Sequence, residues 1–271
     1  MSFMFITANN NPSLISGCYL STVRVLIPDL LTDPEDGFGL QQAVLEEVGS
    51  GAMESTALLW SSGPYAGLTR PETRLPGFPE AAKKMKEVGV PVLVRNSGGG
   101  AIAANAGSLS LSMTFPVEDL RHGLYERYAE GSQVIVAALD KLGVEAEEGE
   151  VEHEFCPGAY SVRAGGPGGI KIAGLAQRVT RRAARVEALI LVSDTAGVRE
   201  TLSLLYPALG LPFRPEGVGD LVGKDGTLTV RRVVCALSEE LARRYGAAEQ
   251  QTGAALLQRA RSLRGTWRAE G

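Results

Sequence analysis

The stretch from His153 to Gln177, HEFCPGAYSVRAGGPGGIKIAGLAQ, constrains the fold most, because it combines a cysteine turn with two strand-like runs. Cys156 lies in a Cys-Pro-Gly turn, and a first strand-like run follows it. A glycine-rich turn then leads into a second run, which carries Lys171. A turn between two adjacent strands brings the start of the first strand close to the second. We therefore predict that Cys156 and Lys171 face one another across a pocket.

This pairing predicts a reactive centre. A thiol beside an ammonium ionises more readily, and the thiolate is the nucleophilic form. His153 precedes Cys156 closely and is a candidate base, while Gln177 is a candidate for holding a polar group near the pocket. The alternatives are a buried core cysteine beside a surface lysine, and a purely structural histidine.

A second motif lies at the end of an aliphatic run, Val90 to Arg95, which predicts a buried strand. The run leads directly into Asn96, Ser97 and the three glycines Gly98–Gly100. Glycines let the backbone approach a ligand closely and present its N–H groups as donors. No GK[ST] follows, so the motif is not a Walker A loop, and a flexible turn is the alternative. The small residues that follow, AIAANAG, favour a cavity beside this loop.

The remaining patterns predict an α/β (α+β) fold with a mixed central sheet flanked by helices, because strands and helices intermix without strict βαβ alternation. Strands are expected at 19–27, 56–60, 108–115 and 183–193, and helices at 38–48, 79–88, 120–142, 195–206, 227–248 and 252–263. Residues 63–79 and 214–225 are expected to be loops. We predict an N-terminal extension with an edge strand over residues 1–36. Residues 37–271 are then one catalytic domain with a helical C-terminal tail.

Composition excludes several classes of function. The formal net charge of −4 over 271 residues argues against a general nucleic-acid binder. Cys18, Cys156 and Cys235 form no CxxC pair, and His122 and His153 complete no metal-ligand spacing, so no metal site is expected. This cysteine usage is typical of a reduced cytoplasmic protein. The sequence shows neither a signal peptide nor an apolar run long enough to span a bilayer, so no membrane partner is expected.

Two motifs carry a resemblance to a known family. RNSGGGAIAANAGSLSLSMTF resembles the glycine-rich segment of the biotin/lipoate protein ligase superfamily. HEFCPGAYSVRAGGPGGIKIAGLAQR resembles its K-[IVF]-[AS]-G-x-[AS]-Q region, preceded by the F/Y-C-P-G element of one branch. That branch comprises the octanoyl-[glycine cleavage H protein]:protein N-octanoyltransferases, amidotransferases of the lipoyl pathway. TRLPGF and QAVLEEVG also resemble this branch, and the likeness covers residues 37–263.

The resemblance implies the catalytic fold shared by class II synthetases and biotin ligases. It also implies transfer of an octanoyl or lipoyl group between carrier-protein lysines in protein lipoylation, with no cofactor. The implied partners are the glycine cleavage H protein and the lipoyl domains of 2-oxoacid dehydrogenases. By the same resemblance, Cys156 is the nucleophile that forms a thioester, and Lys171 binds the acyl carbonyl. Arg95 and Ser97, with Gly98, Gly99 and Gly100, are implied to form the wall of an acyl tunnel.

Three alternatives to this activity remain at this stage. They are an octanoyltransferase that uses an octanoyl carrier protein as donor, an ATP-dependent lipoate-protein ligase, and a non-catalytic acyl-binding relative. Ligases often carry His-Asp where this chain has Ala104-Asn105, and only a helical tail is expected after Leu211. Both departures argue against the ligase. The insert over residues 164–168, AGGPG, is longer than the family pattern and is expected to shift Lys171 relative to Cys156.

A basic cluster follows the second motif in an otherwise acidic chain. It consists of Arg178, Arg181, Arg182 and Arg185. Such clusters are often simply solvated. The functional alternative is that these arginines dock small acidic lipoyl-carrier domains by charge complementarity.

Overall fold

In the computed structural model, which describes residues 23–119, 123–222 and 227–269, the chain is organised around a mixed sheet. The described strands of this sheet follow the order β11-β1-β2-β6-β10-β9-β8-β7. β1 runs parallel to both of its neighbours, whereas β2, β6, β10, β9, β8 and β7 pair in antiparallel fashion. Their bounds are β1 Arg24–Leu26, β2 Thr56–Trp60, β6 Ser108–Pro116, β7 Glu147–Glu148, β8 Val162–Ala164, β9 Ile170–Val179, β10 Ala183–Leu191 and β11 Ala248–Gln250.

A smaller sheet presents the glycine-rich motif. It has the order β4-β3-β5, with β3 at Tyr65–Thr69, β4 at Val92–Arg95 and β5 at Ile102–Ala104. β4 pairs with β3 in parallel, and β5 pairs with it in antiparallel fashion. The glycines therefore form the connection between the two outer strands of this sheet. A short 3-10 helix, η1 at Glu72–Arg74, follows β3, and a second, η2 at Pro215–Gly217, follows α4.

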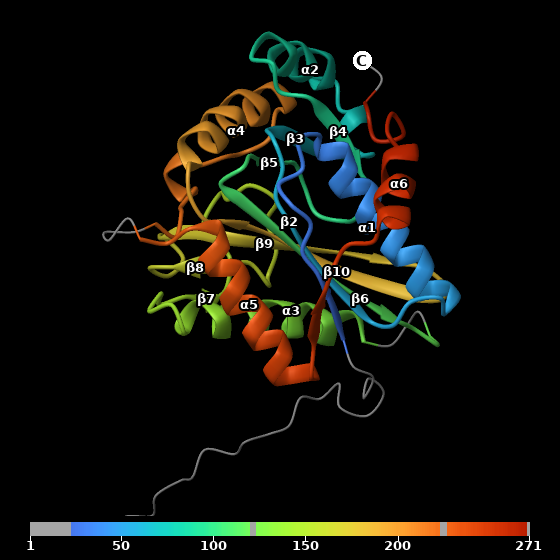
Figure 1. The fold of residues 1–271 in the computed structure, drawn as a ribbon. Helices are drawn as coiled ribbons and strands as arrows, with labels where there is room; N and C mark the ends of the chain where they lie inside the picture. Colours follow the sequence, from blue (N-terminus) through green and yellow to red (C-terminus); the bar gives the residue numbers. More distant parts are fainter. Residues whose placement is uncertain (1–22, 120–122, 223–226, 270–271) are drawn as a thin grey trace, which may run out of the picture.

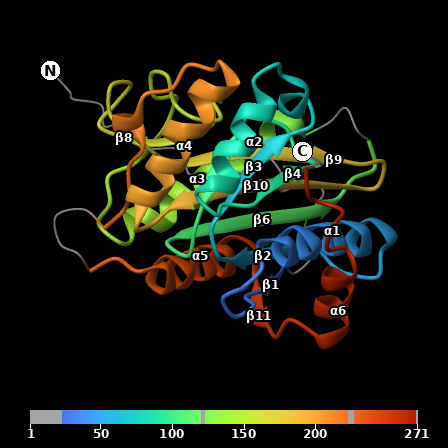
Figure 2. The ribbon, with the colours of Figure 1, turned by 90° about the horizontal axis from the view of Figure 1, so that it is seen from above.

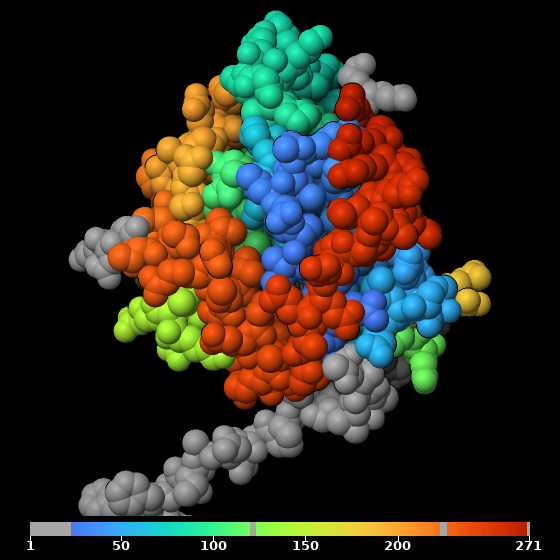
Figure 3. All heavy atoms as spheres, viewed as in Figure 1, coloured from blue at the N-terminus to red at the C-terminus, as the bar shows by residue number. Residues whose placement is uncertain are grey.

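Helices cover both faces of the large sheet (Figures 1 and 2). They are α1 Pro34–Ser50, α2 Phe78–Glu87, α3 Leu124–Asp140, α4 Thr195–Leu209, α5 Val230–Tyr245 and α6 Ala254–Ser262. On one face, α3 and α5 share a single apolar cluster with the strands; on the other, α1, α4 and the small sheet share a second one. Figure 3 shows the C-terminal residues, in red, packed against α1, in blue. None of the described helices is both long and apolar enough to cross a membrane.

The sequence of α1 illustrates why these elements form. Asp33 caps the helix, its side chain accepting a hydrogen bond from Glu35 N at 3.0 Å, and Pro34 occupies the first turn. The apolar face predicted for this helix is buried, and each such side chain contributes roughly 1.5–3 kcal/mol when fully buried. The helix ends at Gly51, which adopts a left-handed conformation with φ of 79°.

The predicted mixed sheet flanked by helices is confirmed, with four corrections. β3 lies inside the predicted loop 63–79; its residues are buried although glycine and proline surround them. β1 is not an edge strand, because β11 covers its outer side; residues 19–22 of that predicted strand lie outside the described residues. α4 continues through Pro207 to Leu209. The predicted helix 227–248 ends at Tyr245, and β11 follows it, so the tail is not purely helical.

Candidate active site

Cys156 lies in the loop between β7 and β8 and adopts an unusual backbone conformation. Its φ is 44°, in the left-handed region that non-glycine residues rarely occupy. Such a conformation costs about 1–3 kcal/mol and persists only where the surroundings impose it. The residue is 4% exposed, and its thiol is free. A strained, buried and free cysteine is therefore the starting point of the site.

Tyr206 of α4 holds one side of this residue. The backbone N–H of Cys156 donates to the Tyr206 hydroxyl at 2.6 Å, and that hydroxyl donates to Ala101 O at 2.8 Å. The phenol thus ties the cysteine loop to the residue that follows the three glycines. Burial raises the pKa of Tyr206 above its usual range, so the hydroxyl keeps its proton and both hydrogen bonds.

Lys171 of β9 holds the other side. Its ammonium donates to Cys156 O at 2.8 Å, to Phe155 O at 2.8 Å and to a carboxylate oxygen of Glu154 at 2.9 Å. An ammonium has three donors, and all three are used here. The chain brings Cys156 and Lys171 together, but at the backbone carbonyl. None of the hydrogen bonds of this ammonium goes to the thiol, and Lys171 does not line the cavity that Cys156 lines. The predicted arrangement, in which the two side chains face one another across a pocket, is therefore not the one found.

Glu154 completes the support of the cysteine loop. Its side chain is 1% exposed, and it accepts hydrogen bonds from Val151 N at 2.8 Å, Gly158 N at 3.2 Å and Ser161 Oγ at 2.6 Å, besides the one from Lys171. The carboxylate therefore connects both ends of the loop to β9. Nothing in the sequence distinguished Glu154 from the solvated glutamates around it.

The sulfur of Cys156 contacts the glycine-rich motif. Gly100 N–H donates to Sγ at 3.2 Å, and Arg95 Nη2 lies 3.4 Å from Sγ while donating to Gly100 O at 2.6 Å. Gly99 has a φ of 89°, and a Cβ there would lie 2.7 Å from Sγ. The motif thus supplies an N–H group, a guanidinium and the space that the thiol occupies.

Behind the sulfur lies a narrow internal cavity of about 30 Å³, room for about one water molecule. Arg95, Cys156 and Glu187 line it, together with mostly apolar side chains: Phe38, Trp60, Tyr65, Ile102, Phe155, Leu175, Ala188 and Leu189. The side chains of Arg95 and Trp60 each bury one nitrogen, Nε and Nε1, that has no hydrogen-bond partner. An acyl chain enters this cavity only if side chains move.

An outer groove of about 810 Å³ lies on the solvent side of the cysteine loop. Gly99, Gly100 and Pro157 line it, with His153 and several acidic side chains. The His153 side chain is 60% exposed, and its imidazole lies 3.8 Å from the Glu152 carboxylate. Among the described contacts, none joins this imidazole to Cys156, so the geometry gives no support to His153 as the base.

The residues implied to form the tunnel wall do not all line the same space. Arg95 lines the internal cavity, whereas Gly99 and Gly100 line the outer groove. Gly98 N–H donates to Gln177 O at 3.1 Å, and the Ser97 hydroxyl contacts Glu187. These two residues fix the loop against the sheet and line neither space.

Gln177 points towards α3 instead of the cavity. Its side-chain amide donates to Leu124 O at 2.6 Å and accepts from Arg127 Nε at 3.0 Å. Gln177 therefore fixes the start of α3 against β9. The polar group that it was predicted to hold belongs to this helix and not to the cavity.

Besides Glu154, sequence analysis missed two further glutamates, the buried Glu72 and the partly exposed Glu187. Glu72 accepts hydrogen bonds from Ala101 N at 2.7 Å and Thr69 N at 2.8 Å, which fixes the exit of the glycine loop. Glu187 of β10 lies 2.8 Å from Arg185 Nε and 4.0 Å from Arg95 Nη1. Glu72 lies in a segment predicted as a loop and Glu187 in an aliphatic strand, and neither pattern indicated that the acid has a structural contact.

The predicted basic cluster is only partly a surface feature. Arg178, Arg181 and Arg182 are exposed around the turn between β9 and β10. Arg185 is buried, pairs with Glu187 and donates to Asn96 Oδ1 at 2.8 Å, so it does not belong to a docking surface.

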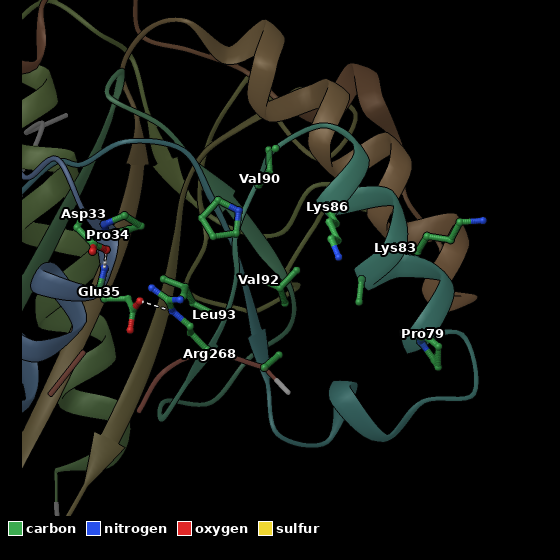
Figure 4. A pocket seen from close by; sticks show the side chains of 14 residues that line it. Asp33, Pro34, Glu35, Pro79, Lys83, Lys86, Val90, Val92, Leu93 and Arg268 are labelled. Carbon is green, nitrogen blue, oxygen red and sulfur yellow. Dashed lines mark hydrogen bonds and ion pairs between the residues drawn. The ribbon is translucent and has the colours of Figure 1, made fainter. Parts of the chain in front are cut away.

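A separate groove of about 890 Å³ lies between α2, β4 and the C-terminal segment (Figure 4). Figure 4 shows Lys86, Val90 and Val92 among the residues that line this groove, and an ion pair between Arg268 and Glu35, whose atoms are 2.7 Å apart. Its lining contains no thiol or hydroxyl and shares no residue with the cavity or groove around Cys156. Within the described ranges, no group of histidine, cysteine and acidic side chains is arranged to hold a metal ion.

The fold and the glycine-rich motif indicate the class of protein to which this chain belongs. The chain superposes on a lipoate-protein ligase A bound with ATP with a TM-score of 0.72, covering 90% of this chain and 94% of that one at 18% identity. A lipoate protein ligase from Thermoplasma acidophilum gives a TM-score of 0.66, covering 89% and 91% at 18% identity. These likenesses establish the fold. Residues 33–209 match the family model for the lipoyl protein ligase A/B catalytic domain, and the chain belongs to this family.

Curated relatives with similar sequences carry transferase names. The octanoyl-[GcvH]:protein N-octanoyltransferase of Geobacillus kaustophilus is 29% identical over 180 residues, which is 66% of this chain and 62% of the relative. Its counterpart in Anoxybacillus flavithermus is 28% identical over 224 residues, covering 77% and 78%. The lipoyl-[GcvH]:protein N-lipoyltransferase of Listeria monocytogenes is 27% identical over 175 residues, covering 63% and 60%. The chain thus matches less than two thirds of the length of two of these three relatives.

Proposed function

We propose that this chain is an acyltransferase that moves an octanoyl or lipoyl group between lysines of carrier proteins through a thioester on Cys156. The observation that carries the proposal is the free thiol of Cys156, which lines a mostly apolar cavity, while its neighbours Gly99, Gly100 and Pro157 line an open groove. The names of the curated relatives support transfer of an octanoyl or lipoyl group and the glycine cleavage H protein as one carrier.

The first half-reaction breaks an amide bond. The Cys156 sulfur attacks the acyl carbonyl of the donor lysine, and a carbon–sulfur bond forms as the carbon–nitrogen bond breaks. The proton that the sulfur gives up is gained by the lysine nitrogen, which leaves as a neutral amine. Gly100 N–H and Arg95 Nη2 donate hydrogen bonds to the reacting sulfur.

The second half-reaction reverses these steps on another carrier. The lysine amine of the acceptor attacks the thioester, a carbon–nitrogen bond forms, and the sulfur leaves and regains a proton. Because the acyl group arrives already bonded to a carrier, the proposed cycle needs neither ATP nor another cofactor. The lipoyl domains of 2-oxoacid dehydrogenases are the proposed acceptors, and the carrier lysine approaches through the outer groove.

The acyl chain is proposed to occupy the internal cavity. Phe38, Ile102 and Leu189 provide apolar walls of the kind that such a chain requires. Because the cavity is only about 30 Å³, binding must displace some of these side chains. Residues of this interior therefore set the acyl length that the protein accepts.

A transfer experiment without ATP tests the proposal. Octanoylated H protein or octanoyl carrier protein is supplied as donor, a lipoyl domain is supplied as acceptor, and intact masses are followed. Octanoylation of the acceptor from octanoylated H protein supports the amidotransferase. Transfer only from the octanoyl carrier protein identifies the alternative donor, and transfer only from free octanoate plus ATP identifies a ligase. No transfer with any of them refutes the proposal.

A further inference from the structure

Among the described residues, the cation that hydrogen-bonds to the reactive sulfur is Arg95 and not Lys171, which the sequence predicted. The Lys171 ammonium has its three donors on Glu154 and on two backbone carbonyls. Arg95 instead reaches the sulfur: its Nη2 lies 3.4 Å from Sγ and is held there by Gly100 O at 2.6 Å. The guanidinium also keeps one buried N–H, on Nε, without a partner.

The other charged groups around Cys156 pair with one another or with other residues of the cluster. Glu154 and Lys171 form a buried ion pair, and Arg185 pairs with Glu187 at 2.8 Å. The Glu72 carboxylate accepts hydrogen bonds from Thr69 and Ala101.

Two phenols, those of Tyr128 and Tyr206, also interact electrostatically with Cys156. Burial, followed by the charge of Cys156, raises the pKa of Tyr128. Burial likewise raises the pKa of Tyr206, and both phenols therefore stay neutral at physiological pH. Of all these groups, only Arg95 directs a positive charge at the sulfur.

We propose that Arg95 is a catalytic residue that holds Cys156 in its thiolate form, jointly with Gly100 N–H. A cation and a hydrogen-bond donor both favour the charged form of a thiol. The interaction also favours the charged form of Arg95. Burial acts to lower the pKa of Arg95, but the charges of Cys156, Glu187 and Glu72 and the hydrogen bond to Cys156 together outweigh burial and raise that pKa.

This inference deepens the proposed function and rests on it only for the acyl step. The state of the sulfur is measured without any donor or acceptor. The full chain carrying Cys18→Ser and Cys235→Ser is compared with a version that also carries Cys156→Ser. The difference in ultraviolet thiolate absorbance between the two is recorded as a function of pH. Failure to find a thiolate and failure to find transfer are thus separate results.

The expected result is a thiolate whose titration midpoint lies well below the value of about 8.5 for free cysteine. In that background, Arg95→Met is expected to raise the midpoint by about one pH unit or more, whereas Arg95→Lys keeps most of the effect. Arg185→Met is the matched control, because it removes a buried arginine from the same cluster without removing a donor to the sulfur.

Two outcomes overturn the inference. One is a midpoint near 8.5 in the protein with unchanged Arg95, a result that needs no folded Arg95 variant. The other is an equal shift in Arg95→Met and Arg185→Met, which indicates that the general charge of the cluster acts on the sulfur. Circular dichroism of each variant establishes that the folded state is the one titrated.

Discussion

Replacement of Lys171 by Met separates a structural from a chemical role for this residue. Lys171 is 0% exposed and Glu154 1% exposed, with their charged atoms 2.9 Å apart. Removing one partner of such a pair costs about 3–5 kcal/mol, because the other charge stays buried without compensation. The substitution also leaves the carbonyls of Phe155 and Cys156 without their donor.

Urea unfolding at neutral pH, followed by circular dichroism, measures this cost. With a slope of about 2 kcal/mol per molar urea, the midpoint is expected to fall by roughly 1.5–2.5 M. Lys171→Met combined with Glu154→Gln is the control, because it removes the orphaned charge. We expect the double variant to be more stable than the sum of the two single losses, with a coupling of about 1 kcal/mol or more.

A specific result refutes this reasoning. If Lys171→Met unfolds at the wild-type urea concentration but has lost all transfer activity, the ammonium acts directly in the reaction. Lys171 then binds the acyl carbonyl, as the family resemblance implies, and the three hydrogen bonds seen here must break during turnover.

Three further predictions concern other parts of the molecule. Gly99→Ala is expected to slow thioester formation about 100-fold, because its Cβ would lie 2.7 Å from the sulfur and displace it; single-turnover kinetics measure this. Arg181→Glu with Arg182→Glu is expected to slow transfer to an acidic carrier domain about tenfold at low salt and less at high salt. Hydrogen bonds from Arg243 lower the pKa of Glu240 to about 2, below its usual 4.5. The stability that this depressed pKa contributes is present above pH 4.5 and is lost as the pH falls towards 2. The urea midpoint of Glu240→Gln should therefore change less across that pH range than the midpoint of the unchanged protein.

Matched controls exist for these variants. A Cβ at Gly98 has its nearest neighbour 4.0 Å away, so Gly98→Ala should keep near-normal rates, and equal losses in both glycine variants would contradict the steric argument. Lys83→Glu reverses an exposed charge in the separate groove of Figure 4. If it slows transfer as much as the arginine reversals do, docking around the β9–β10 turn is wrong. For Glu240, an unchanged acid dependence in the glutamine variant contradicts the assignment.

The local patterns predicted much of the fold. The hairpin of β8 and β9, the strand before the glycines and the apolar face of α1 follow from periodicity and turn residues. The strand before the glycines was predicted to be buried, but it is only half-buried, because Val92 and Val94 are partly exposed. β3 was missed because Gly67 and its glycine and proline neighbours are typical of a loop. In the fold, Gly67 is needed because a Cβ there would lie 2.9 Å from Ile102 of β5. That requirement comes from a neighbouring strand and is invisible in a single sequence.

The site was predicted in its parts but not in its contacts. Cys156 and the glycine motif do meet, and Lys171 does reach the cysteine loop. Which atom each cation contacts depends on where its side chain lies to within a few ångströms. The spacing of residues along the chain does not determine that position. Glu154, Glu72 and Tyr206 escaped notice for a related reason: an acid or a phenol becomes structural only once tertiary packing buries it.

The most direct test of the account is the intact mass of the protein after incubation with octanoylated H protein and no acceptor. The account predicts a gain of one octanoyl group, located on the peptide containing Cys156, released by hydroxylamine and absent from Cys156→Ser. Full transfer by Cys156→Ser, or an octanoyl group found on Lys171 instead, would contradict the account.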